Sequence, residues 1–433
     1  MADDLWIVVP HLGAGGAQKV AMLAAAHFAA LGYRITVVSL LPDKTQVHSV
    51  PAGVRLLDLG EAVKAAQRGD WWDRSLLARS RRFLRLWLPR LASWFLLITL
   101  WPWLRQLRPP RGAALIRWLL RGVGGPQASL LRQLLVAEQP PRLLALLTKT
   151  NMLAAQASWD LPLHLAVSER NDPRLQTLGF PWQRLRLLLY RRADALTANT
   201  RGVLRTLADD LAMPQARLLP NPLPPGIGLA AESPANANAN TNANANGQRS
   251  ADCLAVARLV HQKGLDVLLE AVALMAARPI GWRLVIVGDG PQRPALESQA
   301  RQLGIEAWIR FEGFQADVMP YCRRARIFVL PSRFEGMPNA LLEAMASGLT
   351  AIVTDASPGP LELVEHGHTG LVVPVENPRA LAAAMEALLA DPGHCERLGR
   401  AGRERLAAQD WQVIEPLWRS ALNLPAVSPE RDG

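Results

Sequence analysis

Short apolar runs alternate with helical patterns along this chain, and this alternation constrains the fold more than any other feature. The run Leu5–Val9 is followed by a glycine-rich turn at 11–17, a helical pattern at Gln18–Leu31 and a second apolar run at Arg34–Ser39. Strands that alternate with helices form parallel sheets whose faces are covered by those helices. The sequence therefore predicts an α/β fold.

The alternation occurs twice, which suits a chain of 433 residues because a single core rarely grows that large. Further strands are predicted at Leu143–Leu147, Leu163–Val167, Ala195–Thr197, Cys253–Val256, Arg283–Val287, Ile309–Phe311, Ile327–Leu330 and Ala351–Val353. Between the two series, an Ala-Asn tract at 235–246 has almost nothing to bury. We predict Rossmann-like domains at 1–222 and 251–410, a linker at 223–250, and a C-terminal segment 411–433 whose helix crosses back to the first domain.

A basic, tryptophan-rich insertion at about 62–125 interrupts the first domain. Between Lys64 and Arg132 there are fourteen Lys or Arg and two Asp or Glu, a local excess of +12 against +11 for the whole chain. Tryptophan and arginine together favour the membrane interface. We predict that the Trp71–Arg121 region contacts an anionic membrane surface. The alternatives are a helical pair packed on the sheet or a partner, and a membrane span.

An apolar run, the charge distribution, the cysteines and the N-terminus together indicate where in the cell the protein is expected. The uncharged run Leu91–Leu104 has fourteen residues and includes Pro102, whereas a membrane span needs about twenty. Charge concentrated in one stretch disfavours a nucleic-acid coating, so we expect no nucleic-acid partner. Cysteines at 253, 322 and 395 form no paired motif, which favours a reducing compartment and no zinc site. We expect a cytoplasmic protein, peripheral on the inner face of the cell membrane, because the N-terminus lacks a secretion signal.

The segment Pro331–Gly348 is the most informative part of the chain. Its pattern predicts a strand, a loop and a helix, with Pro338 in the first helical turn and Gly348 at the C-terminal cap. The N–H groups from Gly336 to Asn339 would then be free at the helix N-terminus. Such an end attracts a diphosphate.

Two glutamates, Glu335 and Glu343, are separated by seven intervening residues in that segment, with Gly336-Met337-Pro338-Asn339 after the first and Ala346-Ser347-Gly348 after the second. This pattern resembles the retaining glycosyltransferases of family 4, which have the B-type fold of two Rossmann-like domains facing a central cleft. The resemblance implies that Glu335 is catalytic and contacts the hydroxyls of the donor sugar. It also implies that Glu343 binds the ribose and that the backbone of Gly336, Met337, Pro338 and Asn339 holds sugar and phosphate.

A second segment, Val256–Asp266, carries two cations, Arg258 and Lys263, near a strand end. Arginine offers a planar fork and lysine a point charge to a diphosphate. The resemblance implies that both are catalytic because they stabilise the leaving nucleotide diphosphate. Gly288 and Phe314 match other donor loops of the family, and Phe314 is either a support for the nucleotide base or ordinary core.

The N-terminal glycines Gly15 and Gly16 do not form a GxGxxG motif, and Ser39 rather than an acidic residue ends the second strand. These departures argue against a nicotinamide oxidoreductase. The resemblance implies that Gly15 and Gly16 let the first domain approach the donor phosphates. A plain tight turn is the alternative.

Many family members carry a histidine after the strand predicted at Leu143–Leu147, but here the loop reads Thr148-Lys149-Thr150-Asn151. No histidine base is therefore assigned, and front-face attack is expected. Acceptor contacts are expected from Thr150, Asn151, Glu169 and Arg170, since the segment 168–173 is similar to that of members acting on polysaccharide or lipid-linked glycans. A structural salt bridge is the alternative for Glu169 and Arg170.

The resemblance implies transfer of a sugar, with retention, from a UDP- or GDP-sugar to a glycan or a polyprenyl- or lipid-linked acceptor in polysaccharide, lipopolysaccharide or glycolipid synthesis. No cofactor and no metal are expected. Two other functions stay open: an isomerase or phosphorylase with the same fold, and a catalytically idle membrane-associated scaffold.

Overall fold

A computed structural model describes residues 4–13, 15–41, 48–68, 91–92, 94–96, 98–121, 125–174, 178–179, 182–209, 211–213, 215–224, 253–276 and 282–425. The Ala-Asn tract at 235–246 lies outside the described residues. The chain divides into two compact units. Unit 1 comprises the residues up to 199, 203–219 and those from 415 onward, and unit 2 comprises 200–202 and 220–414.

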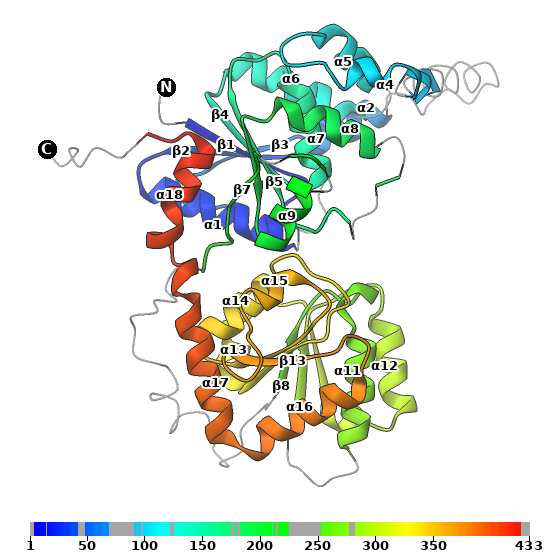
Figure 1. The fold of residues 1–433 in the computed structure, drawn as a ribbon, viewed down its shortest axis with the longest axis vertical. Helices are drawn as coiled ribbons and strands as arrows, with labels where there is room; N and C mark the ends of the chain where they lie inside the picture. Colours follow the sequence, from blue (N-terminus) through cyan, green and yellow to red (C-terminus); the bar gives the residue numbers. More distant parts are fainter. Residues whose placement is uncertain are drawn as a thin grey trace, which may run out of the picture. The chain divides into compact units, whose positions relative to one another are not determined.

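Unit 1 is built on a parallel sheet of seven strands in the order β3-β2-β1-β4-β5-β6-β7, flanked by helices (Figure 1). Its elements are β1 (Asp4–Val9), α1 (Gly16–Ala30), β2 (Arg34–Ser39), β3 (Arg55–Asp58), α2 (Gly60–Arg68), α4 (Trp101–Leu104), α5 (Ala113–Arg121), α6 (Gly125–Glu138), β4 (Arg142–Leu146), α7 (Thr148–Ala157), β5 (His164–Glu169), α8 (Trp182–Leu189), η1 (Tyr190–Arg192), β6 (Ala195–Ala198), α9 (Arg201–Asp209), β7 (Arg217–Leu218) and α18 (Trp411–Leu422). The unit division falls inside α9 and α18.

Unit 2 repeats the plan with a parallel sheet of six strands in the order β10-β9-β8-β11-β12-β13. Its elements are β8 (Cys253–Val256), η2 (His261–Lys263), α11 (Leu265–Met275), β9 (Leu284–Val287), α12 (Arg293–Gln302), η3 (Glu306–Trp308), β10 (Ile309–Gly313), α13 (Met319–Arg324), β11 (Ile327–Leu330), α14 (Asn339–Ala346), β12 (Thr350–Thr354), α15 (Pro358–Leu361), β13 (Gly370–Val373), α16 (Pro378–Ala390), α17 (Pro392–Arg405) and η4 (Leu406–Gln409).

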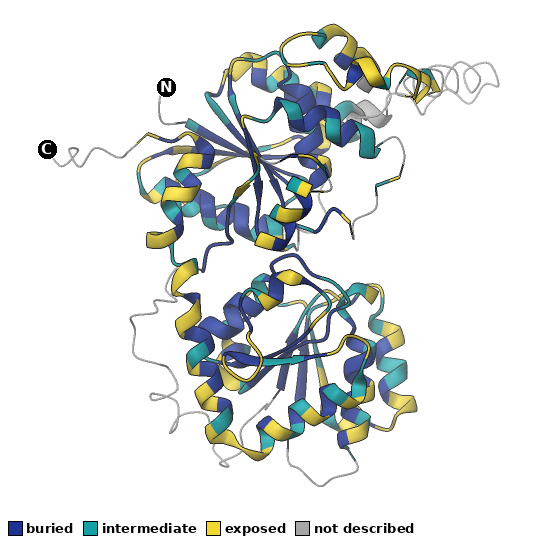
Figure 2. Ribbon diagram, in the orientation of Figure 1, coloured by how far each residue is buried: buried dark blue, intermediate teal, exposed yellow. Residues whose placement is uncertain are grey.

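Burial explains why the strands read as continuous apolar runs. Figure 2 shows the central strands of both sheets buried, with exposed residues on the outer faces of the helices. A parallel sheet covered on both faces needs apolar side chains at successive positions, as in β1 and β11. The helices instead repeat every three to four residues, as Val20, Ala24 and Phe28 of α1 do, each with no exposed surface.

Each predicted strand is found within two residues of its expected ends, but three strands were missed: β3, β7 and β13. All three lie at or next to a sheet edge. The burial pattern of β3 is mostly exposed, and β7 has only two residues. These two edge strands carry too few buried side chains to leave an apolar run in the sequence, whereas β13 (GLVV) is apolar and was overlooked.

The described part of the insertion is joined to unit 1 at one face and exposes apolar side chains on another. Leu104 and Ile116 are buried in the core of unit 1. The indole N–H of Trp159 donates to the Arg111 carbonyl oxygen at 3.0 Å. The large apolar side chains of this described part that are exposed by 43% or more are Leu91, Trp94, Phe95, Ile98, Trp103 and Trp118.

Trp71, Trp72 and Trp87, which the membrane prediction also uses, lie outside the described residues. Among the helices that the structure describes, none combines the length and the apolar character needed to cross a bilayer.

Each sheet has a point where the chain order reverses. In unit 2 this switch point lies between the neighbouring strands β8 and β11, where Ile327 pairs with Cys253 and Phe328 with Leu254. In open α/β sheets the crevice beyond the carboxyl ends of two such strands is the usual ligand site. The loops after β8 and β11 therefore border the expected ligand site.

Candidate functional site

The loops after β8 and β11 are the two segments that the sequence singled out, and they lie against each other. Gly264 has φ +60°, and a Cβ there would lie 2.0 Å from the Pro331 carbonyl oxygen. The Gln262 side-chain amide donates to the Phe334 carbonyl at 2.9 Å. Only glycine permits this approach, because it tolerates the left-handed conformation and has no Cβ.

This contact pairs Lys263 with Glu335. The ammonium Nζ lies 2.5 Å from Oε1 of Glu335, and the two side chains are only 14% and 7% exposed. The Ser332 hydroxyl donates to the same carboxylate oxygen at 2.7 Å. The structure thus brings together two of the predicted catalytic residues at the switch point of unit 2.

Backbone contacts fix the loop that carries Glu335. The Glu335 N–H donates to the Ser357 hydroxyl at 2.9 Å, and the Thr354 hydroxyl donates to the Ser332 carbonyl at 2.5 Å. A Cβ at Gly359 would lie 1.7 Å from the Gly336 carbonyl oxygen. The loop therefore packs on the segment after β12 with no room for a larger residue at 359.

The helix after this loop, α14, begins at Asn339, one residue later than predicted. Pro338 is its N-cap, with φ −77° and ψ 116°, and does not belong to the first helical turn as predicted. The pyrrolidine ring fixes φ near this value in either place, so the sequence pattern did not distinguish them. Gly348 follows the last turn with φ +80°, as its predicted capping role requires.

Other predicted donor residues of unit 2 differ in their burial. Met337 is buried, and its carbonyl accepts from the Asn221 side-chain amide at 3.2 Å. Glu343 is buried inside α14 at 4% exposure, whereas Arg258 is exposed. Phe314 is 43% exposed and is therefore not ordinary core.

Gly288, another predicted donor residue, occupies a tight crossing of strand ends. It has φ +136°, and a Cβ there would lie 1.9 Å from the Ala257 carbonyl oxygen. Its N–H donates to the Gly313 carbonyl at 2.7 Å. A side chain at 288 would push apart the loops after β8 and β9.

In unit 1, Gly15 is the N-cap of α1, and Gly16 is the first residue of that helix. The backbone of Gly15 is extended, and a Cβ there would lie 2.1 Å from Oε1 of the Gln18 side chain. These glycines stand at the carboxyl end of β1, which is one of the two strands at the switch point of this sheet.

The predicted acceptor residues of unit 1 lie in a buried polar cluster. Thr150 and Asn151 belong to the first turn of α7, not to the loop that the sequence suggested. The Glu169 carboxylate accepts from the Thr148 hydroxyl at 2.8 Å and from the Tyr190 hydroxyl. Both of these partners of Glu169 are hydroxyl groups.

Burial shifts the pKa values of Glu169, Tyr190 and Arg170 in this cluster. Loss of solvent raises the pKa of Glu169 above its ordinary value, although hydrogen bonds from Tyr190 and Thr148 oppose the rise. Burial, followed by the charge of Glu169, raises the pKa of Tyr190 well above its ordinary value. Burial lowers the pKa of Arg170 to about 9. The Arg170 guanidinium lies 5.7 Å from the ring centroid of Trp418.

Sequence reasoning missed several residues of these sites. Tyr190 and Asn221 are far in sequence from the groups they contact, and Ser332 and Ser357 are common loop residues. Arg333 stands inside the most informative segment, but nothing local distinguishes its role. No local pattern identifies such partners, because the fold alone makes them neighbours.

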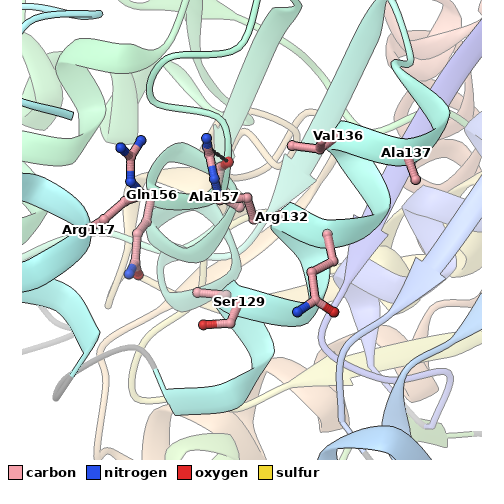
Figure 3. A pocket seen from close by; sticks show the side chains of 9 residues that line it. Arg117, Ser129, Arg132, Val136, Ala137, Gln156 and Ala157 are labelled. Atoms are coloured by element: carbon pink, nitrogen blue, oxygen red, sulfur yellow. Dashed lines mark hydrogen bonds between the residues drawn. The ribbon is translucent and has the colours of Figure 1, made fainter. Parts of the chain in front are cut away.

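A separate pocket of 480 Å³ lies in unit 1 among α5, α6 and α7 (Figure 3). Arg117 and Arg132 line it, and both pair with Asp160, at 2.5 and 2.6 Å. None of the predicted site residues lines this pocket. Its arginines join the insertion helix α5 to the body of unit 1. Among the described residues, no group of three His, Cys, Asp or Glu is placed to hold a metal ion.

Comparison with known proteins locates the similarity mainly in unit 2. The family described as glycosyl transferases group 1 matches residues 238–405. A lipopolysaccharide core biosynthesis glycosyltransferase of Rhizobium meliloti is 31% identical over 224 residues, which are 52% of this chain and 62% of that protein. A GDP-mannose-dependent phosphatidylinositol monomannoside mannosyltransferase of Mycobacterium tuberculosis is 34% identical over 37% of this chain and 44% of its own length. The matches thus span less than two thirds of either relative.

The solved structure of the Anabaena protein HepE in complex with UDP-glucose resembles the whole chain. The TM-score is 0.69 over 97% of this chain and 100% of that one, at 17% sequence identity. At such low identity the likeness concerns the fold alone. It confirms the predicted architecture of two Rossmann-like α/β domains of the B-type.

Proposed function

We propose that this chain transfers a sugar from a nucleotide-sugar donor to an acceptor, with retention of configuration, because residues 238–405 match the family described as glycosyl transferases group 1. The observation that carries the proposal is the Lys263–Glu335 pair at the switch point of unit 2. A cation and a carboxylate held together there match the two demands of a nucleotide-sugar: one group for its diphosphate and one for its hydroxyls.

The donor is proposed to be a UDP- or GDP-sugar held by unit 2. Lys263 and the exposed Arg258 offer positive charge to the diphosphate, and the N-terminus of α14 at Asn339 adds the partial charge of its backbone. Glu343 would bind the ribose, and the exposed ring of Phe314 would support the base. The HepE complex contains UDP-glucose and the mycobacterial relative is described as GDP-mannose-dependent, which supports both nucleotides as candidates.

The proposed reaction is a front-face substitution at the anomeric carbon. The bond from that carbon to the diphosphate oxygen breaks, the bond to the acceptor oxygen forms on the same face, and the acceptor proton passes to the departing diphosphate. Negative charge grows on the diphosphate, so Lys263 and Arg258 act as electrostatic catalysts. Glu335 accepts hydrogen bonds from sugar hydroxyls and thereby orients the donor. No metal ion is invoked.

The acceptor is proposed to be a glycan or a polyprenyl- or lipid-linked saccharide bound by unit 1, with contacts from the cluster around Thr150, Asn151, Glu169 and Arg170. Work on an envelope glycan is supported by the lipopolysaccharide relative.

We further propose that the Trp71–Arg121 region binds an anionic membrane surface on the inner face of the cell membrane. Trp103 is 75% exposed and Trp118 45%, so both indoles are available to a lipid interface. Arg105 and Arg108 are exposed and close enough to Arg191 for their charges to lower its pKa, after burial as the main cause. Like charges gathered beside exposed indoles suit phosphate headgroups.

A donor panel tests the enzymatic proposal. The purified protein is mixed with each of several UDP- and GDP-sugars and with membrane lipid extract, and the release of nucleotide diphosphate is measured. We expect one donor to stand out, and only when extract is present. Glu335→Gln should abolish most of that signal, whereas Glu270→Gln, an exposed carboxylate on α11, should not.

The outcomes separate the alternatives. Conversion of a nucleotide-sugar into an isomer, with no net release of nucleotide diphosphate, favours an isomerase. Release with orthophosphate as the only acceptor, with formation of a sugar phosphate, favours a phosphorylase. Silence with every donor, together with no UDP or GDP binding by calorimetry, favours the idle scaffold.

Vesicle binding tests the membrane proposal. Trp103→Ser and Trp118→Ser should each reduce sedimentation with vesicles of phosphatidylglycerol and phosphatidylcholine. Leu274→Ser is the matched control because Leu274 is also exposed, by 48%, but lies on α11. Equal binding by all three variants and the unaltered protein would refute the proposal.

A further inference from the structure

The side chain of Arg333, which lies in the same loop as Glu335, forms hydrogen bonds with three other residues. Arg333 follows β11 by three residues, and its side chain is only 14% exposed. Nη1 donates to the His261 carbonyl at 2.6 Å and to Oδ1 of Asp266 at 2.8 Å. Nη2 donates to Oδ2 of Asp266 at 2.7 Å and to Oε2 of Glu376 at 3.1 Å, and Nε donates to Oε1 of Glu376. All five N–H donors of the guanidinium therefore have an acceptor.

These bonds hold residues on both sides of Lys263 in the chain. Arg333 binds the carbonyl of residue 261 and the carboxylate of residue 266, and its own N–H donates to the Gln262 carbonyl at 2.8 Å. It thus holds the turn on both sides of Lys263. Arg333 also stands two residues before Glu335, the partner of that lysine.

The electrostatics of this cluster favour a fixed structure over a site for an anionic ligand. One guanidinium faces two carboxylates, Asp266 and Glu376, so the group carries a net negative charge. The hydrogen bonds from Arg333 hold the pKa of Asp266 below its ordinary value, and those carboxylates raise the pKa of Arg333. A planar fork bound to three separate groups resists rotation in a way that a point charge does not.

We propose that Arg333 is a positioning residue, which fixes Lys263 against Glu335 so that cation and carboxylate meet the donor in one geometry. This inference rests on the proposed function, and it assigns to Arg333 no contact with the substrate. An error of about 1 Å in the placement of a catalytic group costs about a hundredfold in rate. Loss of Arg333 should therefore reduce the rate of the transfer step much more than the affinity for the donor.

The variants are Arg333→Met, which keeps the length of the stem, and Arg333→Lys, which keeps the charge. Asp266 and Glu376 keep 35% and 52% exposure, so water can solvate them when the guanidinium is absent, and the fold should survive. Leu388→Ala is the control for general destabilisation, because Leu388 is buried in α16 and is remote in sequence from both loops.

Two readouts are taken for each variant. The first is the rate at which acetic anhydride acetylates Lys263, with acetate as the leaving group, measured by mass spectrometry with the exposed Lys149 as internal reference. The second is kcat and KM for the active donor. We expect Arg333→Met to raise acetylation of Lys263 several-fold and to lower kcat by about a hundredfold with little change in KM. Arg333→Lys should recover part of both, and Leu388→Ala should change neither.

Both readouts must change for the inference to stand. Unchanged acetylation of Lys263 in Arg333→Met, or a kcat no lower than that of Leu388→Ala, overturns it. If the unaltered protein turns over no donor, the proposed function fails by itself, and the acetylation rates still decide whether Arg333 holds Lys263 in place.

Discussion

Removing one partner of the Lys263–Glu335 pair should destabilise the protein more than removing both. Lys263→Met leaves the Glu335 carboxylate at 7% exposure without its cation, and Glu335→Gln leaves the ammonium at 14% exposure without its anion. Removal of one partner of a buried pair costs about 3–5 kcal/mol. Because both side chains keep some contact with solvent, we expect each single variant to lose about 3 kcal/mol, the lower end of that range.

The double variant removes both charges and leaves no uncompensated ion. Replacing a buried pair by neutral side chains is often close to neutral in stability. We therefore expect the double variant to be about 1 kcal/mol or less from the unaltered protein, so that the double-mutant cycle has a coupling energy of several kcal/mol. Transfer activity should not recover with it, because each group removed is a separate partner of the transition state and is worth about a hundredfold in rate.

Urea unfolding at neutral pH gives the stabilities, and nucleotide diphosphate release gives the rates. The matched pair for comparison is Arg400 and Glu396, which lie 3.2 Å apart on α17 with 63% and 53% exposure. Their cycle should show a coupling of about 0.5 kcal/mol. Additive losses at Lys263 and Glu335, or a double variant that regains activity along with stability, would refute the reasoning.

Three further predictions concern the Glu169 carboxyl group, the conformation of Gly264 and the need for a metal ion. Burial raises the pKa of Glu169 in the folded state, so the stability of the protein falls as pH rises from the pKa of the unfolded state through that of the folded state. The stability of Glu169→Gln should therefore increase relative to that of the unaltered protein as pH rises across that window. A difference in urea midpoint between the two proteins that does not vary with pH would contradict this. Gly264→Ala should lower Tm more than Gly304→Ala. The two glycines have similar φ values, +60° and +67°, but of the two only a Cβ at 264 would clash with a backbone atom, the Pro331 carbonyl oxygen. Equal shifts in Tm would exclude this clash. Turnover should survive a chelator, and its loss would show a metal requirement.

The sequence determined the class of fold and the residues of the candidate donor site. Continuous apolar runs are typical of strands covered on both faces, and they located β1, β8 and β11 without tertiary information. The segment containing Glu335 was recognisable because its glycine, proline and glutamate positions follow local backbone rules. Such rules act over a few residues, which is the range that a sequence pattern can report.

Only the tertiary structure decided which of these groups meet. Lys263 and Glu335 are 72 residues apart, and they pair because β8 and β11 are neighbours in the sheet. The same is true of Tyr190, which lies 21 residues from the Glu169 that it contacts. The role of Arg333 depends on acceptors from two separate segments, at 261–266 and at 376. Each of these contacts depends on strand order and loop packing, which no local pattern of residues encodes.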